Sequence, residues 1–249
     1  LLGSDNGGTV TPTDGSVTGD KLASNIAIAT TADASFGSKI GVNTTHPASG
    51  AGLDKFIEVQ GGDPGVVLRD DTASDAVELY NAGGNFIVYT GSADAFKIDS
   101  AGHITKPLQS AFHVDPSTDQ NNFGQNPDAW VNVVFGTEVF DQNADFASNT
   151  FTAPVTGRYF LNAVVRLNSV DEAANYYWLR LNTSNRIIYG TLYDLDGLGS
   201  DPNYWALTVC ALTDMDANDT VTLDIIQNGG TIQTDVDGSG THFSGFLAC

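Results

Sequence analysis

Apolar and polar residues alternate strictly along parts of the second half of the chain, and this alternation limits the possible fold more than any other feature. Every second residue from Tyr159 to Leu167 is apolar, and the same pattern runs from Val221 to Ile225. A period of two with one apolar side is typical of a β-strand that rests on a core. Stretches that read as strands occupy residues 111–114, 130–140, 151–153, 158–168, 176–182, 186–193, 204–212, 220–227 and 242–248. Strands of this number and spacing predict a sandwich of the jelly-roll type.

The same pattern predicts which side chains are buried. We expect a core built from the apolar positions of the alternating strands and from the closing segment FSGFL. Its members are Tyr159, Leu161, Val165, Val221, Leu223, Phe243 and Phe246. Cys210 lies inside a predicted strand and is expected to be a small buried apolar group with a free thiol. Cys249 is the last residue, and no C-x-x-C spacing is present.

Charge excludes several classes of partner. The chain has 30 acidic residues against 10 Lys and Arg, which gives a net charge of -20 at pH 7. Nucleic acids and anionic membrane surfaces are bound through clustered Lys and Arg, so neither is expected as a partner. No apolar run approaches the roughly 18 residues of a membrane span, so no membrane insertion is expected. Only four of the acids are Glu; the rest are Asp, which favours turns over helices.

The chain divides into three parts by composition. Residues 1–25 are rich in Gly, Ser, Thr and Asp and are typical of an extended linker. Residues 26–106 contain short apolar bursts at 56–60, 65–70, 76–81, 85–90 and 95–99, separated by turn sequences, which predict a β-meander. Such ribbons bury little surface alone, so we expect a trimeric shaft or collar. All five Lys precede Pro107 and most aromatic residues follow it, so the head is assigned to 107–249.

The predicted head resembles the globular head of the complement first component and its tumour-necrosis-factor relatives. The segments that carry the resemblance are AFHV from Ala111, FTAPVTGRYFL from Phe151, the turn Asn218-Asp219 before TVTLDI, and FSGFL from Phe243. The resemblance implies a ten-stranded jelly roll that assembles as a homotrimer. The loop after Asp141 is longer than is usual in that family, so loop-borne binding residues are not carried over.

The N-terminal part resembles the shaft and collar sequences of phage tail fibres. The phrases are DGSVTGDKLAS from Asp14, KIGVNTTHPAS from Lys39, and IDSAGHITKP from Ile98. With the head, they imply a distal tail-fibre protein of the virion that joins an upstream fibre or tail protein and binds a bacterial surface glycan or protein. A secreted or surface-anchored bacterial adhesin with the same head is the alternative. The opening Leu1 and the single Met, Met215, indicate a piece of a longer polypeptide.

Clusters of Asp near the C-terminus are candidate calcium ligands. Ca²⁺ takes several oxygen ligands, and heads of the resembled family often hold calcium. Asp194, Asp196, Asp214 and Asp216 are the candidates, although none lies in an EF-hand loop and solvated turns are the favoured explanation of any single cluster.

Aromatic residues between 176 and 205 are candidates for stacking on a sugar receptor. They also fit a core or a subunit interface. Among them, Tyr193, Tyr204 and Trp205 are predicted to contact the receptor.

A capsule-degrading enzyme would need two carboxylates on either side of one bond. No nucleophile motif is present and the four His show no metal-ligand spacing, so catalysis is not expected.

Overall fold

The computed structural model describes residues 62–249 except 71, 73–75, 92, 124–127 and 196. Every regular element in this part of the chain is a β-strand, and all strand pairs are antiparallel. No helix in the described residues is long and apolar enough to cross a membrane. The all-β prediction is confirmed. The predicted linker at 1–25 and the predicted strand at 56–60 lie outside the described residues.

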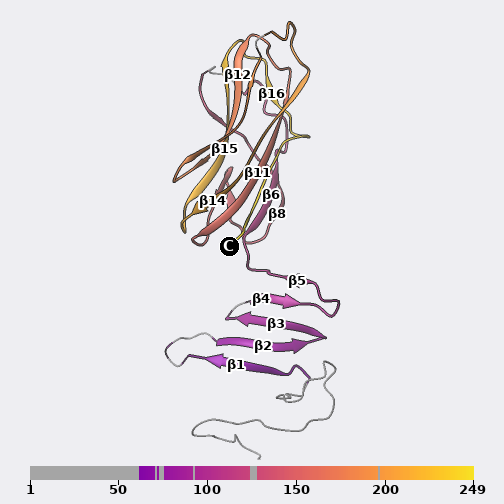
Figure 1. The fold of residues 1–249 in the computed structure, drawn as a ribbon. Coiled ribbons are helices and arrows are strands. Elements are labelled where there is room, and N and C mark those ends of the chain that lie inside the picture. Colours follow the sequence, from indigo (N-terminus) through magenta and orange to yellow (C-terminus); the bar gives the residue numbers. More distant parts are fainter. Residues whose placement is uncertain (1–61, 71, 73–75, 92, 124–127, 196) are drawn as a thin grey trace, which may run out of the picture. The chain divides into compact units, whose positions relative to one another are not determined.

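The first sheet is a five-stranded meander in which each strand pairs with the next along the chain (Figure 1). Its strands are β1 (Gly65–Arg69), β2 (Ala76–Ala82), β3 (Asn85–Thr90), β4 (Ala93–Ile98) and β5 (Ile104–Thr105). Gly83 and Gly84 join β2 to β3 with φ values of 57° and 80°, which favour a tight hairpin turn that needs glycine. The four strands predicted between residues 65 and 99 are therefore present.

This meander has little core of its own. Ile87 is the only apolar residue of β1 to β5 that the described structure buries. All five residues of β1 are exposed, although three of them are Val or Leu. Phe86 and Ile104 are also exposed on later strands.

The head contains two sheets packed on one core. The first, called the β11 sheet, has the order β14-β11-β17-β6-β8 with β16 beside β11; its strands are β6 (Ala111–Asp115), β8 (Thr137–Asp141), β11 (Gly157–Asn168), β14 (Tyr204–Met215), β16 (Asp235–Val236) and β17 (His242–Leu247). The second, called the β15 sheet, has the order β13-β12-β15-β10-β9 with β7 beside β15; its strands are β7 (Val131–Asn132), β9 (Phe146–Ala147), β10 (Thr150–Thr152), β12 (Ala174–Thr183), β13 (Ile187–Asp194) and β15 (Thr220–Gly229).

The strand order identifies the head as a jelly roll. The first and last long strands, β6 and β17, are neighbours, and β10 pairs with β15 across a long stretch of chain. The connections β10–β11, β11–β12, β13–β14 and β14–β15 each cross from one sheet to the other, whereas β9–β10 and β12–β13 are hairpins within the β15 sheet. Interleaving of this kind is the signature of two Greek keys wound together. Ten strands lie on the two main sheet paths, as predicted, and the two-residue strands β7 and β16 lie beside them.

Six of the seven predicted core residues are buried. Tyr159, Leu161, Val165, Val221, Leu223 and Phe243 all have 0% exposure. Buried aromatic rings gather at one end of this core, where Phe112 stacks on Phe151 at 4.7 Å and meets Phe243 edge-on at 5.0 Å.

Phe246 corrects the prediction, because it is 46% exposed. Side chains of a strand alternate between its two faces, so Phe243 and Phe246, three residues apart, point to opposite sides of β17. Gly245 takes the inward position instead. A Cβ there would lie 2.8 Å from the Phe112 ring and 2.7 Å from Leu161, so glycine leaves room for the buried rings.

The predicted strand at 130–140 is also corrected. It is two strands, β7 and β8, that belong to different sheets. Between them the chain crosses the edge of the sandwich, where the Phe135 amide donates to Asn149 Oδ1 at 2.7 Å. The break was concealed because the crossing segment itself buries Val133 and Phe135, as a strand would, while β7 and β8 contain no buried residue.

Candidate functional site

A surface without Asp, Glu, Lys or Arg occupies the central rows of the outer side of the β11 sheet, away from the core. Charged residues lie on the same side beyond these rows, namely Arg158, Asp214, Arg166 and Asp115. Strand register places Leu212, Phe160 and Phe246 in one row across β14, β11 and β17. The next row runs from Cys210 through Asn162 and Ser244. We call this surface the apolar face; its members are Ala111, His113, Phe140, Phe160, Asn162, Val164, Cys210, Leu212, His242, Ser244 and Phe246.

The apolar face exposes large hydrophobic side chains and carries no Asp, Glu, Lys or Arg. Leu212 is 59% exposed, Phe140 49% and Phe246 46%. A shallow pocket of about 310 Å³ lies among Phe140, Phe160 and Phe246. A contiguous apolar surface is a mark of an interaction site. The sequence analysis did not predict the apolar face. The apolar residues Phe160 and Val164, at outward positions of β11, could have indicated it.

Two histidines lie at one side of the apolar face. The rings of His113 and His242 are 5.5 Å apart, and a hydrogen bond of 3.1 Å links His113 Nε2 to Asp115 Oδ1. Burial lowers the pKa of His242, and the neighbouring His113 lowers it further, while Asp115 acts in the opposite direction. Neutral His242 is therefore the form that the folded chain favours.

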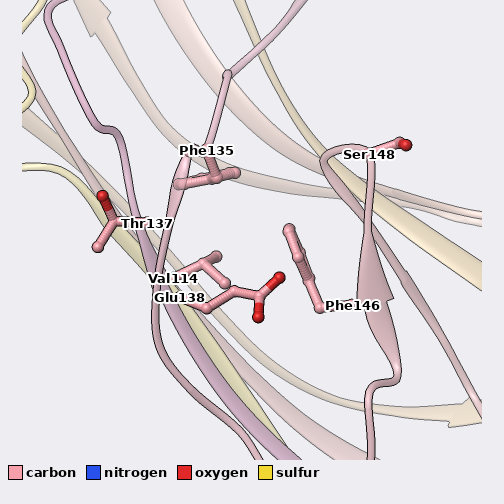
Figure 2. A pocket seen from close by; sticks show the side chains of 7 residues that line it. Val114, Phe135, Thr137, Glu138, Phe146 and Ser148 are labelled. Atoms are coloured by element: carbon pink, nitrogen blue, oxygen red, sulfur yellow. The ribbon is translucent and has the colours of Figure 1, made fainter.

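A second pocket opens between the edge strands β8 and β9 of the two sheets (Figure 2). Its volume is about 310 Å³, and its apolar wall consists of Val114, Phe135 and Phe146. The Glu138 carboxylate extends over this wall toward Phe146. Glu138 is the single acidic residue among those that line the pocket, whereas glycoside hydrolysis needs two carboxylates.

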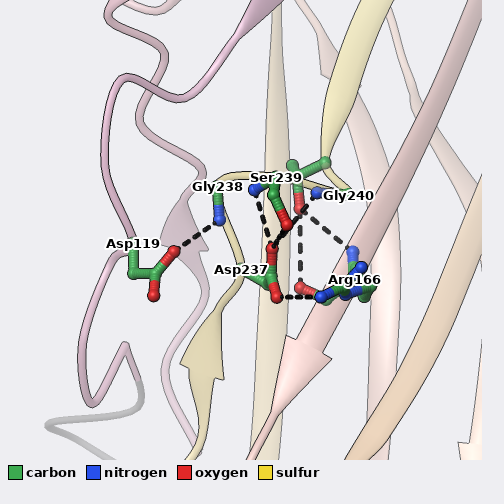
Figure 3. A network of polar contacts seen from close by, with 7 residues as sticks. Asp119, Arg166, Asp237, Gly238, Ser239 and Gly240 are labelled. Atoms are coloured by element: carbon green, nitrogen blue, oxygen red, sulfur yellow. Dashed lines mark hydrogen bonds and ion pairs between the residues drawn. The ribbon is translucent and has the colours of Figure 1, made fainter.

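The loop before β17 is organised by Asp237 (Figure 3). Its carboxylate accepts hydrogen bonds from the Ser239 amide and hydroxyl, both at 2.7 Å, and from Arg166 Nη2 at 2.5 Å. Burial alone would raise the pKa of Asp237, but the hydrogen bonds from Ser239, Asn168 and Arg166 outweigh it and lower the pKa to about 2. The Asp237 carboxylate holds the turn that leads into β17, whereas Arg166 Nε and Asn168 Oδ1 are buried without a hydrogen-bond partner in the described structure.

The structure does not gather the predicted calcium ligands in a single chain. Asp214 forms an ion pair with Arg186 at 2.7 Å, and Asp194 and Asp216 are exposed. Asp196 lies outside the described residues. No group of three His, Cys, Asp or Glu among the described residues could hold a metal ion, so a calcium site built by several chains stays a prediction.

The predicted receptor-binding residues have different environments. Tyr193 and Trp205 meet edge-on at 5.1 Å and pack partly buried against the core. Tyr204 is 62% exposed and lies under the Arg166 guanidinium, 4.9 Å from the ring centre. The three therefore do not form one exposed aromatic surface.

Cys210 corrects the prediction of a buried thiol. Both Cys210 and Cys249 are free and exposed. Cys210 pairs with Asn162, in the outward phase of β14, while its neighbour Val209 points into the core. The thiol of Cys210 thus belongs to the apolar face.

Known structures with related shapes include two heads of animal proteins. The globular domain of the zebrafish complement 1qA protein is similar with a TM-score of 0.41 and 18% identity, over 57% of this chain and 98% of that chain. Murine APRIL at pH 5.0 is similar with a TM-score of 0.40 and 12% identity, over 56% of this chain and 98% of that chain. No protein-family model and no curated protein matches the sequence. The jelly-roll assignment rests on the strand order described above.

Proposed function

We propose that the chain forms a homotrimer that serves as the distal tip of a phage tail fibre, with the head attaching to a glycan or protein on a bacterial surface. The observation that carries the proposal is the apolar face. The chain has a net charge of -20, so copies repel one another over most of their surface. The apolar face is where they can pack without that repulsion, and it buries Phe140, Phe160, Leu212 and Phe246 in doing so.

The five-stranded meander supports the same assembly. A single sheet with exposed apolar side chains needs a second layer to be stable. Val66, Val67 and Leu68 of β1 are each about half exposed in one chain. Association of three copies would supply the missing layer for these side chains.

The place on a fibre is supported by the sequence before the head. Phrases of the kind found in tail-fibre shafts begin at Asp14, Lys39 and Ile98 and stand in order upstream of the jelly roll. That order favours a virion fibre, joined to an upstream fibre or tail protein, over a secreted adhesin.

Light scattering of the full chain tests the assembly. The expected mass is three times 26.2 kDa. Phe246→Asp places a charge in the apolar face and should abolish the trimer, whereas Ile232→Asp, at a residue 47% exposed in a loop outside that face, should leave it intact. A stable, folded monomer of the unaltered chain at micromolar concentration would overturn the assembly.

Adsorption tests the attachment. Fluorescently labelled full chain is applied to bacterial strains with defined deletions of surface polysaccharides, and loss of binding in one class of deletion identifies the receptor class. Absence of binding to every strain refutes the adhesive role. Release of reducing ends from host polysaccharide would instead show a capsule-degrading enzyme.

A further inference from the structure

Four aromatic side chains form a continuous surface on the outer side of the β15 sheet. We call it the aromatic patch; it consists of Trp130, Tyr176, Trp178 and Tyr189. Trp178 stacks on Tyr189 with ring centres 4.0 Å apart and planes 20° apart. Trp130 lies 6.1 Å from Trp178 and 6.0 Å from Tyr189, and Tyr176 meets Trp178 edge-on at 6.4 Å. Residues distant in the chain thus build one surface.

The aromatic patch faces outward rather than into the core. Tyr176 and Trp178 alternate along β12 with the buried Tyr177 and Leu179. Tyr189 is 48% exposed, and Trp130 is partly exposed. Large aromatic groups left in contact with water at one place are typical of binding surfaces.

Polar groups at the patch are left available for a ligand. Trp178 Nε1 donates to the Gly190 carbonyl at 3.1 Å. Within the described residues, the indole nitrogen of Trp130 and the hydroxyls of Tyr176 and Tyr189 have no hydrogen bond. A buried indole N–H or phenol hydroxyl usually has a partner within the protein. These three groups face solvent instead, so they are available to hydrogen-bond with the hydroxyls of a ligand.

A satisfied ion pair holds the aromatic patch in place. The Arg180 guanidinium lies 4.0 Å above the Trp130 ring and contacts Asp224 Oδ2 at 2.9 Å. Asp224, only 5% exposed, also accepts hydrogen bonds from Asn132 and from Thr222. Arg180 and Asp224 neutralise each other, and the guanidinium packs on the Trp130 ring. The exposed acid beside the patch is Asp194, which lies opposite Tyr176 on β13.

We infer that the aromatic patch is a binding surface for a neutral polysaccharide built from hexopyranose units. The faces of such sugar rings present C–H bonds that pack on aromatic rings, and their hydroxyls match the free groups of Trp130, Tyr176 and Tyr189. Acidic polysaccharides are excluded by charge, because the head carries a net -13 and Arg180 is already paired with Asp224. The inference rests on the proposed adhesive function and names its site.

The aromatic patch and the apolar face belong to different sheets. Trp178 and Tyr189 lie on the β15 sheet, whereas Phe246 lies on the β11 sheet. Trimer formation through the apolar face therefore leaves the patch open, and each activity can be tested without the other.

Tryptophan fluorescence provides the test, because two of the three Trp lie in the aromatic patch. The full-length chain is titrated with maltohexaose, cellohexaose, chitohexaose, mannohexaose and, as an acidic comparison, an alginate hexamer. We expect saturable binding of at least one neutral hexamer and none of alginate. Trp130→Ala and Tyr189→Ala should weaken that binding at least tenfold. Ile232→Ala, at a loop residue that is 47% exposed and lies outside the aromatic patch and the apolar face, should bind as the unaltered chain does.

Folding and assembly of each variant are checked by circular dichroism and light scattering. Trp130→Ala removes the ring under Arg180, so this variant can fail to fold. The test therefore relies on the binding measured for Tyr189→Ala, which changes an exposed position. Unchanged binding by Tyr189→Ala, or loss of binding by Ile232→Ala alone, overturns the inference. A chain that adsorbs to bacteria but binds none of the neutral hexamers overturns the inference and leaves the adhesive function standing. A chain that adsorbs to no strain refutes the adhesive function itself.

Discussion

Asp237 shows how one side chain fixes a loop that the fold needs. It is 6% exposed, and its partners Arg166 and Ser239 come from β11 and from its own turn. An ion pair of this kind stabilises the folded chain only while the carboxylate is charged. The pH dependence of folding therefore reports on this loop.

We predict that Asp237 contributes to acid sensitivity. Its pKa is about 2 in the folded chain and 3.8 in the reference state, so its stabilising effect is complete above pH 4 and is lost as the pH falls from 4 toward 2. The difference corresponds to roughly 2 kcal/mol of unfolding free energy. Asp237→Asn should lower stability at pH 7 and flatten its dependence on pH between 4 and 2, as measured by urea denaturation. Glu138→Gln, at an exposed site, is the control; an equal effect of both changes would contradict the assignment.

His242 is predicted to make assembly sensitive to mild acid. Its pKa lies below the ordinary value of 6.5, so the stability that depends on neutral His242 is complete above pH 6.5 and falls as the pH drops through that value. Protonation would also place charge in the apolar face beside His113. The melting temperature of the trimer should fall between pH 7.5 and 5.5, and less so in His242→Gln. His103→Gln, on the meander, should behave as the unaltered chain; identical pH profiles for all three would refute the prediction.

At the scale of elements, the two sheets close on each other along the edge strands β13 and β14. Gly190 makes this possible, because a Cβ at that position would lie 2.5 Å from Val209 Cβ and 2.6 Å from the Thr208 carbonyl. The Thr191 hydroxyl donates to that same carbonyl at 2.9 Å. A register shift in the pairing of β12 with β13 lies beside Gly190, as expected where a bulge redirects an edge strand.

We predict that Gly190→Ala destabilises the head. The added methyl group meets main-chain and Cβ atoms of β14 that cannot turn aside, and overpacking of this kind costs about 1 to 3 kcal/mol. Urea denaturation should show a lower midpoint. Gly62→Ala, where a Cβ meets nothing within 4 Å, should leave the midpoint unchanged. An unaltered midpoint in Gly190→Ala would mean that the two edges are not in contact.

At the scale of the whole molecule, charge opposes the assembly that apolar surface favours. The head has 17 acidic residues against four Arg, a net -13, so three heads bring 39 negative charges together. Charges further apart than about 8 Å are largely screened at physiological salt, but loops that converge on the axis of the proposed trimer would lie within the range where repulsion acts. Divalent cations between such loops would relieve the repulsion.

We predict that millimolar Ca²⁺ raises the melting temperature of the trimer and that a chelator lowers it, because a cation that binds only the folded assembly stabilises it by mass action. Asp194, Asp196 and Asp216 are the expected ligands, and Asp214 joins them only if it leaves Arg186. Scanning calorimetry at equal ionic strength, with NaCl replacing CaCl₂, separates binding from screening. Equal melting temperatures in calcium and chelator would show that these residues are solvated turns.

The sequence by itself determined the local structure of this protein. Alternation in the stretch that became β11 placed Tyr159, Leu161 and Val165 in the core, because a strand has only two faces and one of them was apolar. Turn residues such as Gly83 and Gly84 marked the ends of the meander strands, since few other residues adopt a positive φ. The jelly-roll class followed from the number and spacing of the strands and from the family resemblance.

Only the tertiary structure decided which surfaces are left open. Phe243 and Phe246 have the same side chain in the same strand, yet one is buried and the other is exposed, because their positions differ by an odd number of residues. The break between β7 and β8 was hidden because it depends on which sheet each strand joins. The exposure of Cys210 was hidden because it depends on which face of β14 meets the core. The aromatic patch joins Trp130 to Trp178 and Tyr189, which are remote in the chain. Such surfaces arise from strand pairing between distant segments, and local pattern carries no information about that pairing.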